Sequence, residues 1–253
     1  MATAASTPPS EPAVRYSTAR VLTSPQAQSF SWEHPIPVSP FWDPLPYPTS
    51  ACFLNAFASS PAELAALPID PASTAPNPEK ITLLLSLLQA KLAREQQAIT
   101  TTPLHIANHP LWSAITLGIA SLQSQLPDQL AAAEVTIRAL ADHRIDKANL
   151  GPLHMLADHL VKVGKFVEAE ETERAVLRWM EAHERLGRDS PQALGARRII
   201  VRAMWGQGRR TEAEEMMREI EGIVEGLGEG SRFGVYQEEE RGLFGQLVGE
   251  LRR

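Results

Sequence analysis

This sequence of 253 residues has one cysteine, no long apolar run and no excess of positive charge. The single cysteine, Cys52, cannot form an internal disulfide, and no Cys/His cluster has the spacing of a zinc site. These absences exclude a disulfide scaffold and a zinc module. No run of about 18 apolar residues occurs, so we expect no membrane span. A formal net charge of -6 also argues against a general nucleic-acid binder.

Catalytic signatures are missing as well. The sequence has no Gly-rich phosphate loop and no Gly-x-Ser-x-Gly elbow. In its best histidine cluster, His154 and His159 are five residues apart and should lie on different faces of a helix. The sequence therefore predicts no catalytic residues, no cofactor and no metal, and the alternative is a helical enzyme whose site has no recognisable motif.

The sparing use of cysteine favours a reducing compartment, and we expect a cytoplasmic protein. Residues 1–30 contain Arg15, Arg20, several serines and threonines and one acid, Glu11. This composition is also typical of an organelle transit peptide, so mitochondrial targeting is the alternative.

Proline is distributed very unevenly. Fifteen of the 20 prolines lie within residues 1–78, which leaves five for the remaining 175 residues. The sequence therefore predicts a proline-rich arm over residues 1–78 and a helical-repeat domain over residues 79–253. Residues 1–28 have few large side chains and are expected to be disordered.

Aromatic side chains are interleaved with the prolines of residues 30–67, which we call the strap. They include Trp32, Phe41, Trp42 and Tyr47. Linkers are poor in aromatics, so the strap is expected to bind something, and the prolines of residues 35–48 favour an extended polyproline conformation. We expect it to dock on the chain's own helices, with an external partner as the alternative.

Apolar residues at helical spacing predict a series of helices after the strap. A capping box at Ser60 begins a short one, and on the next helix Lys91 is expected on the polar side. The helices predicted outside the repeat described below span roughly residues 60–67, 79–98, 109–125, 128–143 and 235–252.

A repeated motif marks the second half of the chain. The segment Gly164-Lys-Phe-Val-Glu-Ala169-Glu-Glu is echoed by Gly208-Arg-Arg-Thr-Glu-Ala213-Glu-Glu, which begins 208 − 164 = 44 residues later. Each glycine is expected to end a helix with a positive φ angle. Each alanine should let the following helix approach the preceding one closely, which predicts two helix pairs.

A joint of the form Leu-Gly187-Arg-Asp-Ser190-Pro191-Gln-Ala-Leu connects the two copies. Gly187 should end one helix, while Ser190 and Pro191 cap and begin the next. With the two Gly-[Lys/Arg]-x-x-Glu-Ala-Glu-Glu turns, this joint resembles the tetratricopeptide repeat superfamily, and within it the long repeats of the kinesin light chain type. The resemblance implies an all-α, right-handed helical-repeat solenoid of antiparallel helix pairs.

The resemblance covers residues 153–227 and has two departures. The 44-residue spacing exceeds the standard repeat of about 34 residues. The proline expected after Leu227-Gly228 is also absent, since Glu229-Gly-Ser-Arg follows there.

Arginine is the only strong cation late in the chain, with 14 arginines and no lysine after residue 168. Most should pair with glutamates one helical turn away, as Arg174 with Glu170 and Glu214 with Arg218 suggest.

Three arginines, Arg197, Arg198 and Arg202, cluster on the helix class that lines the concave groove in the family resembled. Because arginine forks suit carboxylates, these three with Trp205 form the candidate site for a protein or peptide partner. An acidic peptide and a salt-bridged surface are the two interpretations of the arginines. The predicted function is a non-catalytic adaptor or scaffold, with a subunit of a stable complex or a homo-oligomer as the alternative.

Overall fold

Helices make up most of the structure, a computed structural model that describes residues 14–15, 21–22, 34–57, 66–99, 101–228 and 230–253. The helices of this part are α1 (Tyr47–Phe57), α3 (Asn77–Ala98), α4 (Leu104–Ala107), α5 (His109–Gln123), α6 (Leu130–Asp142), α7 (Gly151–Lys162), α8 (Phe166–Ala182), α9 (Pro191–Gly206), α10 (Arg210–Gly226) and α11 (Gln237–Leu251). Short 3-10 turns, η1 (Pro127–Gln129) and η2 (Gly234–Tyr236), precede α6 and α11. The predicted all-α class is confirmed.

The long helices predicted from apolar spacing agree with α3, α5, α6 and α11 to within a few residues at either end. The sequence did not predict the short helix α4, which has one apolar turn and no period to detect. The short helix predicted from Ser60 falls on residues 58–65, which lie outside the described part of the chain.

Part of the strap is helical. Residues 47–57 form α1, so the expected extended conformation is wrong for Tyr47 and Pro48. Pro48 is the second residue of the helix, where its missing N–H costs no hydrogen bond, and the rest of α1 contains no proline. Trp32 lies outside the described residues.

The strap packs against α3 and α5 through its aromatic side chains. Phe41, Trp42 and Phe53 are buried in an apolar cluster that includes Leu84 of α3 and Ile115 of α5. The rings of Phe41 and Trp42 meet edge to face, with centroids 4.9 Å apart. Docking on the chain's own helices is therefore confirmed for residues 34–57, and residue 78 does not mark the edge of the packed core.

Tyr47, the first residue of α1, is hydrogen-bonded to the backbone of His34. Its hydroxyl accepts a hydrogen bond from the His34 amide at 2.8 Å and lies 3.1 Å from the His34 carbonyl, to which it donates. The half-buried ring thereby ties the start of α1 to the chain that precedes it.

Two buried lysines of α3 hold the strap in place. Lys91 Nζ donates to the carbonyls of Ala56 and Phe57 at 3.0 and 2.9 Å, and so caps the C-terminal end of α1. Lys80 Nζ donates to the Pro40 carbonyl at 2.8 Å. The expectation that Lys91 faces solvent is wrong, because α1 covers the side of α3 on which it lies.

A small antiparallel sheet joins the N-terminal region to the strap. Its strand order is β2 (Val21–Leu22), β1 (Val14–Arg15) and β3 (Ile36–Pro37). Arg15 Nη2 donates to the carbonyls of Trp42 and Leu45 at 2.9 and 3.0 Å. Disorder is therefore the wrong expectation for these N-terminal strand residues, because backbone pairing and the hydrogen bonds of Arg15 order them. The other residues of 1–28 lie outside the described part.

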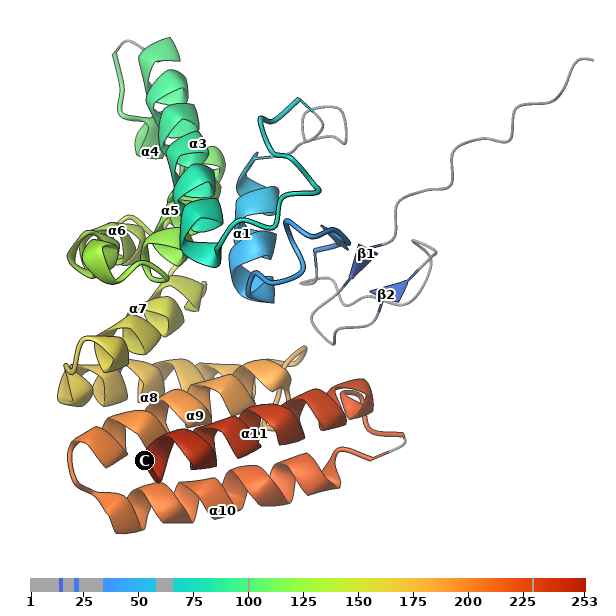
Figure 1. Cartoon of the computed structure of the whole chain (residues 1–253). Helices are drawn as coiled ribbons and strands as arrows, with labels where there is room; N and C mark the ends of the chain where they lie inside the picture. The colour runs from blue at the N-terminus through green and yellow to red at the C-terminus, as the bar shows by residue number, and fades with distance from the viewer. Residues whose placement is uncertain (1–13, 16–20, 23–33, 58–65, 100, 229) are drawn as a thin grey trace, which may run out of the picture.

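The helices after the strap pack in chain order, with α5 against α6, α6 against α7, α7 against α8, α8 against α9 and α9 against α10 (Figure 1). In addition, α9 contacts α7, and α11 contacts both α9 and α10. The helices α8, α9, α10 and α11 form one end of the molecule, and α1, α3 and α5 form the other (Figure 1).

The two glycine turns have the predicted conformation. Gly164 and Gly208 have φ angles of 76° and 78°, the left-handed region that favours glycine. The residue after each glycine donates its amide to the last turn of the preceding helix, Lys165 to Leu160 at 2.8 Å and Arg209 to Met204 at 3.0 Å. Both turns are thus Schellman-type helix ends.

The joint between the copies forms as predicted at Ser190 and Pro191, but the expectation that Gly187 ends a helix is wrong, because α8 already ends at Ala182 and His183 is extended. Gly187 has a φ angle of 87° and donates its amide to the Met180 carbonyl at 3.1 Å. Ser190 Oγ accepts from the Ala193 amide at 3.2 Å, and Pro191 is the first residue of α9. The local chemistry of the joint therefore fixes where α9 begins, and Gly187 lies in the turn that follows α8.

The motif alanines lie in the helix contacts. Ala169 is fully buried in a cluster with Leu160 of α7 and Ala203 of α9. Ala213 is fully buried in the C-terminal cluster with Ile200. Larger side chains would not fit at either position without moving the neighbouring helices.

Candidate functional site

Arg197 is buried among the chain's own acids and does not face a partner. Only 1% of it is exposed. Its guanidinium pairs with Glu181 of α8 and lies 3.3 Å from the carboxylate of Glu219 on α10. It also donates to the Arg188 carbonyl at 3.0 Å. This arginine therefore links the three helices α8, α9 and α10.

The other two arginines are paired with α11. Arg198 is buried and forms an ion pair with buried Glu240, whose pKa is raised because burial outweighs the nearby guanidinium. Nearer the surface, Arg202 Nε donates a hydrogen bond to Glu250 Oε2 at 3.0 Å. The acidic-peptide hypothesis is wrong for Arg197 and Arg198, because carboxylates of distant segments already neutralise them. All three arginines form the ion pairs that the salt-bridge interpretation expects.

The motif glutamate Glu170 connects the two glycine turns. It accepts from Arg174 at 2.7 Å, the pair expected from the sequence, and it is buried. Its second oxygen accepts from Gln207 at 2.7 Å and Arg209 at 2.5 Å, both at the second turn. Although burial raises the pKa of Glu170, the hydrogen bonds from Arg174 and Gln207 and the nearby arginines outweigh it and lower the pKa.

His154 and His159 lie in different environments, as their spacing predicts. His154 Nδ1 lies 2.6 Å from Glu173 Oε1 of α8. Burial lowers the pKa of His154, but the hydrogen bond and the charge of Glu173 outweigh it, so the pKa is raised. The pKa of Glu173, which is fully buried, is raised by burial. His159 is 1% exposed and its pKa is lowered by burial.

The thiol of Cys52 is not activated. Burial raises its pKa to about 11, against a small opposing effect of the hydrogen bond with Ser121. A thiolate nucleophile is therefore not available at neutral pH. Within the described residues no three His, Cys, Asp or Glu side chains are grouped so that they could hold a metal ion.

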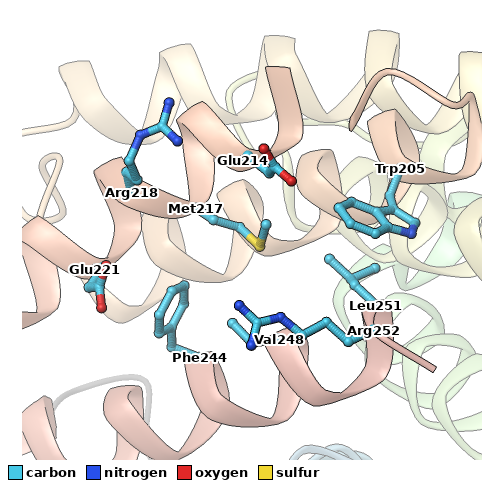
Figure 2. Close-up of a pocket in the computed structure, with 9 residues that line it drawn as sticks. All are labelled: Trp205, Glu214, Met217, Arg218, Glu221, Phe244, Val248, Leu251 and Arg252. Carbon is cyan, nitrogen blue, oxygen red and sulfur yellow. The ribbon is translucent and has the colours of Figure 1, made fainter. Parts of the chain in front are cut away.

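An open slot lies between α10 and α11, and Trp205 of α9 stands at one end of it (Figure 2). Its volume is about 360 Å³. Met217 of α10 faces Phe244 and Val248 of α11 across the slot (Figure 2). These three side chains are half-buried, so the slot offers apolar surface to a partner.

Charged side chains form the rim of the slot. Glu214, Arg218 and Glu221 come from α10, and Arg252 comes from the end of α11. All four are exposed, and among the described residues none has a hydrogen bond or ion pair. The pair expected between Glu214 and Arg218 does not form, and Figure 2 shows the guanidinium of Arg218 directed away from the slot.

A second hollow of about 710 Å³ adjoins the slot on the side of α7. Its walls come from α7, α9, α11 and the first residue of α8, and Val161 and Phe166 supply apolar surface. Trp205 and Leu251 line both hollows, and we call the combined depression the Trp205 groove. Arg202 also lines it, so the structure brings two of the four candidate residues to one surface.

The orientation of the tryptophan is held by a neighbouring cation. The guanidinium of Arg210 stacks over the Trp205 ring at 5.2 Å from its centroid. Trp205 is therefore half-buried but keeps part of its ring in the groove.

The sequence did not show that Met217, Phe244 and Val248 would lie partly exposed in a surface slot. All three have the spacing of core positions, and α11 was expected only to cap the helices. No signal in the sequence shows that α10 and α11 separate at this end, because the separation depends on how two whole helices pack.

No helix in the described residues is long and apolar enough to cross a bilayer. Comparisons of the chain with models of known families, with curated proteins and with solved structures found no match.

Proposed function

We propose that this chain is a non-catalytic protein-interaction module, an adaptor or scaffold built as a tetratricopeptide-like solenoid of antiparallel helix pairs. Two observations support the repeat assignment. The glycine turns share their sequence and their φ angles, and the helix contacts recur in order, since α9 touches α7 and α8 as α11 touches α9 and α10. An open helical array offers long surfaces but no enclosed, water-excluded site.

The observation that carries the proposal is the Trp205 groove. Aromatic and aliphatic side chains of α9, α10 and α11 line it, and charges surround them. This is the composition of a protein interface, with an apolar centre that includes a tryptophan and a polar rim. The groove, and not the buried arginines, is therefore the proposed partner-binding surface.

Affinity purification of the full chain, followed by quantitative mass spectrometry, tests this function. The Trp205→Ser variant should lose the bound partners, because the tryptophan supplies the central apolar contact. Trp179→Ser is the matched control, since Trp179 is also half-buried but contacts His183 and does not line the groove. Equal recovery of partners by both variants would exclude the groove as the binding site, provided that circular dichroism shows both to be folded.

A further inference from the structure

The slot corresponds to an interface that is closed elsewhere in the same molecule. Adding the repeat spacing of 44 residues to Ile200 and Met204 of α9 gives Phe244 and Val248 of α11. Ile200 and Met204 are 0% and 1% exposed, packed between α9 and its neighbours. Phe244 and Val248, in contrast, are only half-buried and line the slot.

The same comparison links two glutamates of opposite environment. Glu170 and Glu214 hold the same position in the two motif copies. Glu170 is buried and accepts hydrogen bonds from Arg209 and Gln207, which the following turn supplies. Glu214 is exposed at the rim, and neither Arg253, which holds the position of Arg209, nor any other described residue donates a side-chain hydrogen bond to it.

We infer that the slot receives an amphipathic helix of a partner protein that carries an arginine for Glu214 and apolar side chains for Met217, Phe244 and Val248. The inference rests on the proposed interaction function and names the chemistry of the partner. In the 44-residue register α11 takes the place of α9, and the partner helix would add to the slot the two kinds of contact that Glu170 and its neighbours have: an apolar face and a guanidinium on the motif glutamate. A charge-assisted hydrogen bond of this kind is among the stronger polar contacts of an interface.

Glu214 is well placed for this contact. Figure 2 shows it on α10 near Trp205, above the space between Met217 and Val248. The guanidinium of Arg218 points away from that space, whereas the side chain of Arg252 extends across it beside Val248 and has to move aside for a partner helix (Figure 2). A helix lying along the slot can therefore bring apolar side chains to the floor and an arginine to the rim.

A displayed library of 16-residue helix-forming peptides, selected on the full chain, is the probe. We expect the selected peptides to combine an apolar face with an arginine or lysine. Their affinity should fall about tenfold or more for the Glu214→Arg variant, because one charge-assisted hydrogen bond is replaced by repulsion. Glu215→Arg is the control, since Glu215 is equally exposed on α10 but does not line the slot. A peptide with glutamate in place of its arginine should regain affinity for Glu214→Arg.

Three results would overturn the inference: selected peptides without a basic residue, equal affinity for the Glu214→Arg and Glu215→Arg variants, or light scattering that shows a dimer lost on Glu214→Arg. The last result would assign the slot to a second copy of the chain. Peptides that lose affinity for Trp205→Ser but not for Glu214→Arg would remove only the arginine-bearing helix and leave the interaction function standing.

Discussion

Two buried basic side chains, Lys91 and Arg197, each connect separate helices of this protein. Lys91 caps α1 from α3, and Arg197 joins α9 to acids of α8 and α10. When a buried carbonyl or carboxylate loses such a donor, the free-energy cost of removing it from water is no longer offset by a hydrogen bond. These residues should therefore matter more for stability than the many ion pairs at the surface.

Replacing Lys91 by methionine keeps an aliphatic chain of similar length but leaves the carbonyls of Ala56 and Phe57 without this donor. We expect the free energy of unfolding to fall by about 1–3 kcal/mol, measured by urea denaturation. Arg94→Met is the control, because the Arg94 side chain is 67% exposed on the same helix. It should change the stability by less than about 0.5 kcal/mol. Equal stabilities of the two variants would contradict the capping role of Lys91.

The pair of His154 and Glu173 should make stability depend on pH. Because the pKa of His154 is raised in the folded protein, its stabilising effect is complete below its usual pKa of about 6.5 and is lost as pH rises through the folded value. The raised pKa of Glu173 acts in the same direction. We expect the melting temperature of the wild type, relative to His154→Gln, to be higher at pH ~6 than at pH ~8.

His159 provides a control of opposite sign. Its pKa is lowered by burial, so its contribution to stability is lost as pH falls through its usual value. The advantage of the wild type over His159→Gln should therefore grow with rising pH. If the difference between the wild type and His154→Gln does not change with pH, the pair does not take up a proton on folding.

At the scale of the elements, the helix ends are set by local conformation. Gly164 adopts a φ angle of 76°, and no atom lies within 4 Å of the place where a Cβ would stand. An alanine there would be strained by its backbone alone. The helix boundary is thus a property of a few neighbouring residues.

Alanine substitutions at two glycines should change stability in opposite directions. Gly164→Ala should lower the free energy of unfolding by about 1–2 kcal/mol, because an L-residue resists the left-handed conformation. Gly222→Ala, in the interior of α10 with open space around its Cβ position, should raise it by about 0.5–1 kcal/mol. Chemical denaturation measures both. A neutral Gly164→Ala would contradict the assigned helix end.

At the scale of the whole molecule, the strap is part of the core. Ile36, Phe41, Trp42, Phe53 and Leu54 are at most 3% exposed, so their removal would expose the apolar faces of α3 and α5. Each such side chain contributes about 1.5–3 kcal/mol by burial. The N-terminal helices therefore depend on the strap for their stability.

Limited proteolysis tests this dependence. Chymotrypsin should cleave after Phe41 and Trp42 in the native protein about tenfold or more slowly than in a peptide of residues 34–57, because cleavage first requires opening of the packed segment. Deletion of residues 1–57 should lower the melting temperature and increase the binding of a hydrophobic dye. Equal cleavage rates in the protein and the peptide would contradict the docked strap.

The helices and helix boundaries that depend on residues close together in the chain could be predicted from the sequence. Apolar spacing predicted the long helices, the turns at Gly164 and Gly208 predicted where α7 and α9 end, and Ser190 with Pro191 predicted where α9 begins. These features rest on backbone preference and capping, which act over a few residues. Aromatic content likewise predicted that the strap docks, since large apolar side chains seek burial wherever a surface is offered.

Whatever depends on partners distant in the chain was decided by the tertiary structure. Arg198 and Glu240 are 42 residues apart, and only the packing of α11 on α9 makes them a buried ion pair. Residues 47–57 form a helix that packs on α5 and α3, and the burial of Lys91 follows from its contact with the end of α1. The slot exists because α10 and α11 separate beside Trp205, and side-chain identities alone do not set the angle between two helices.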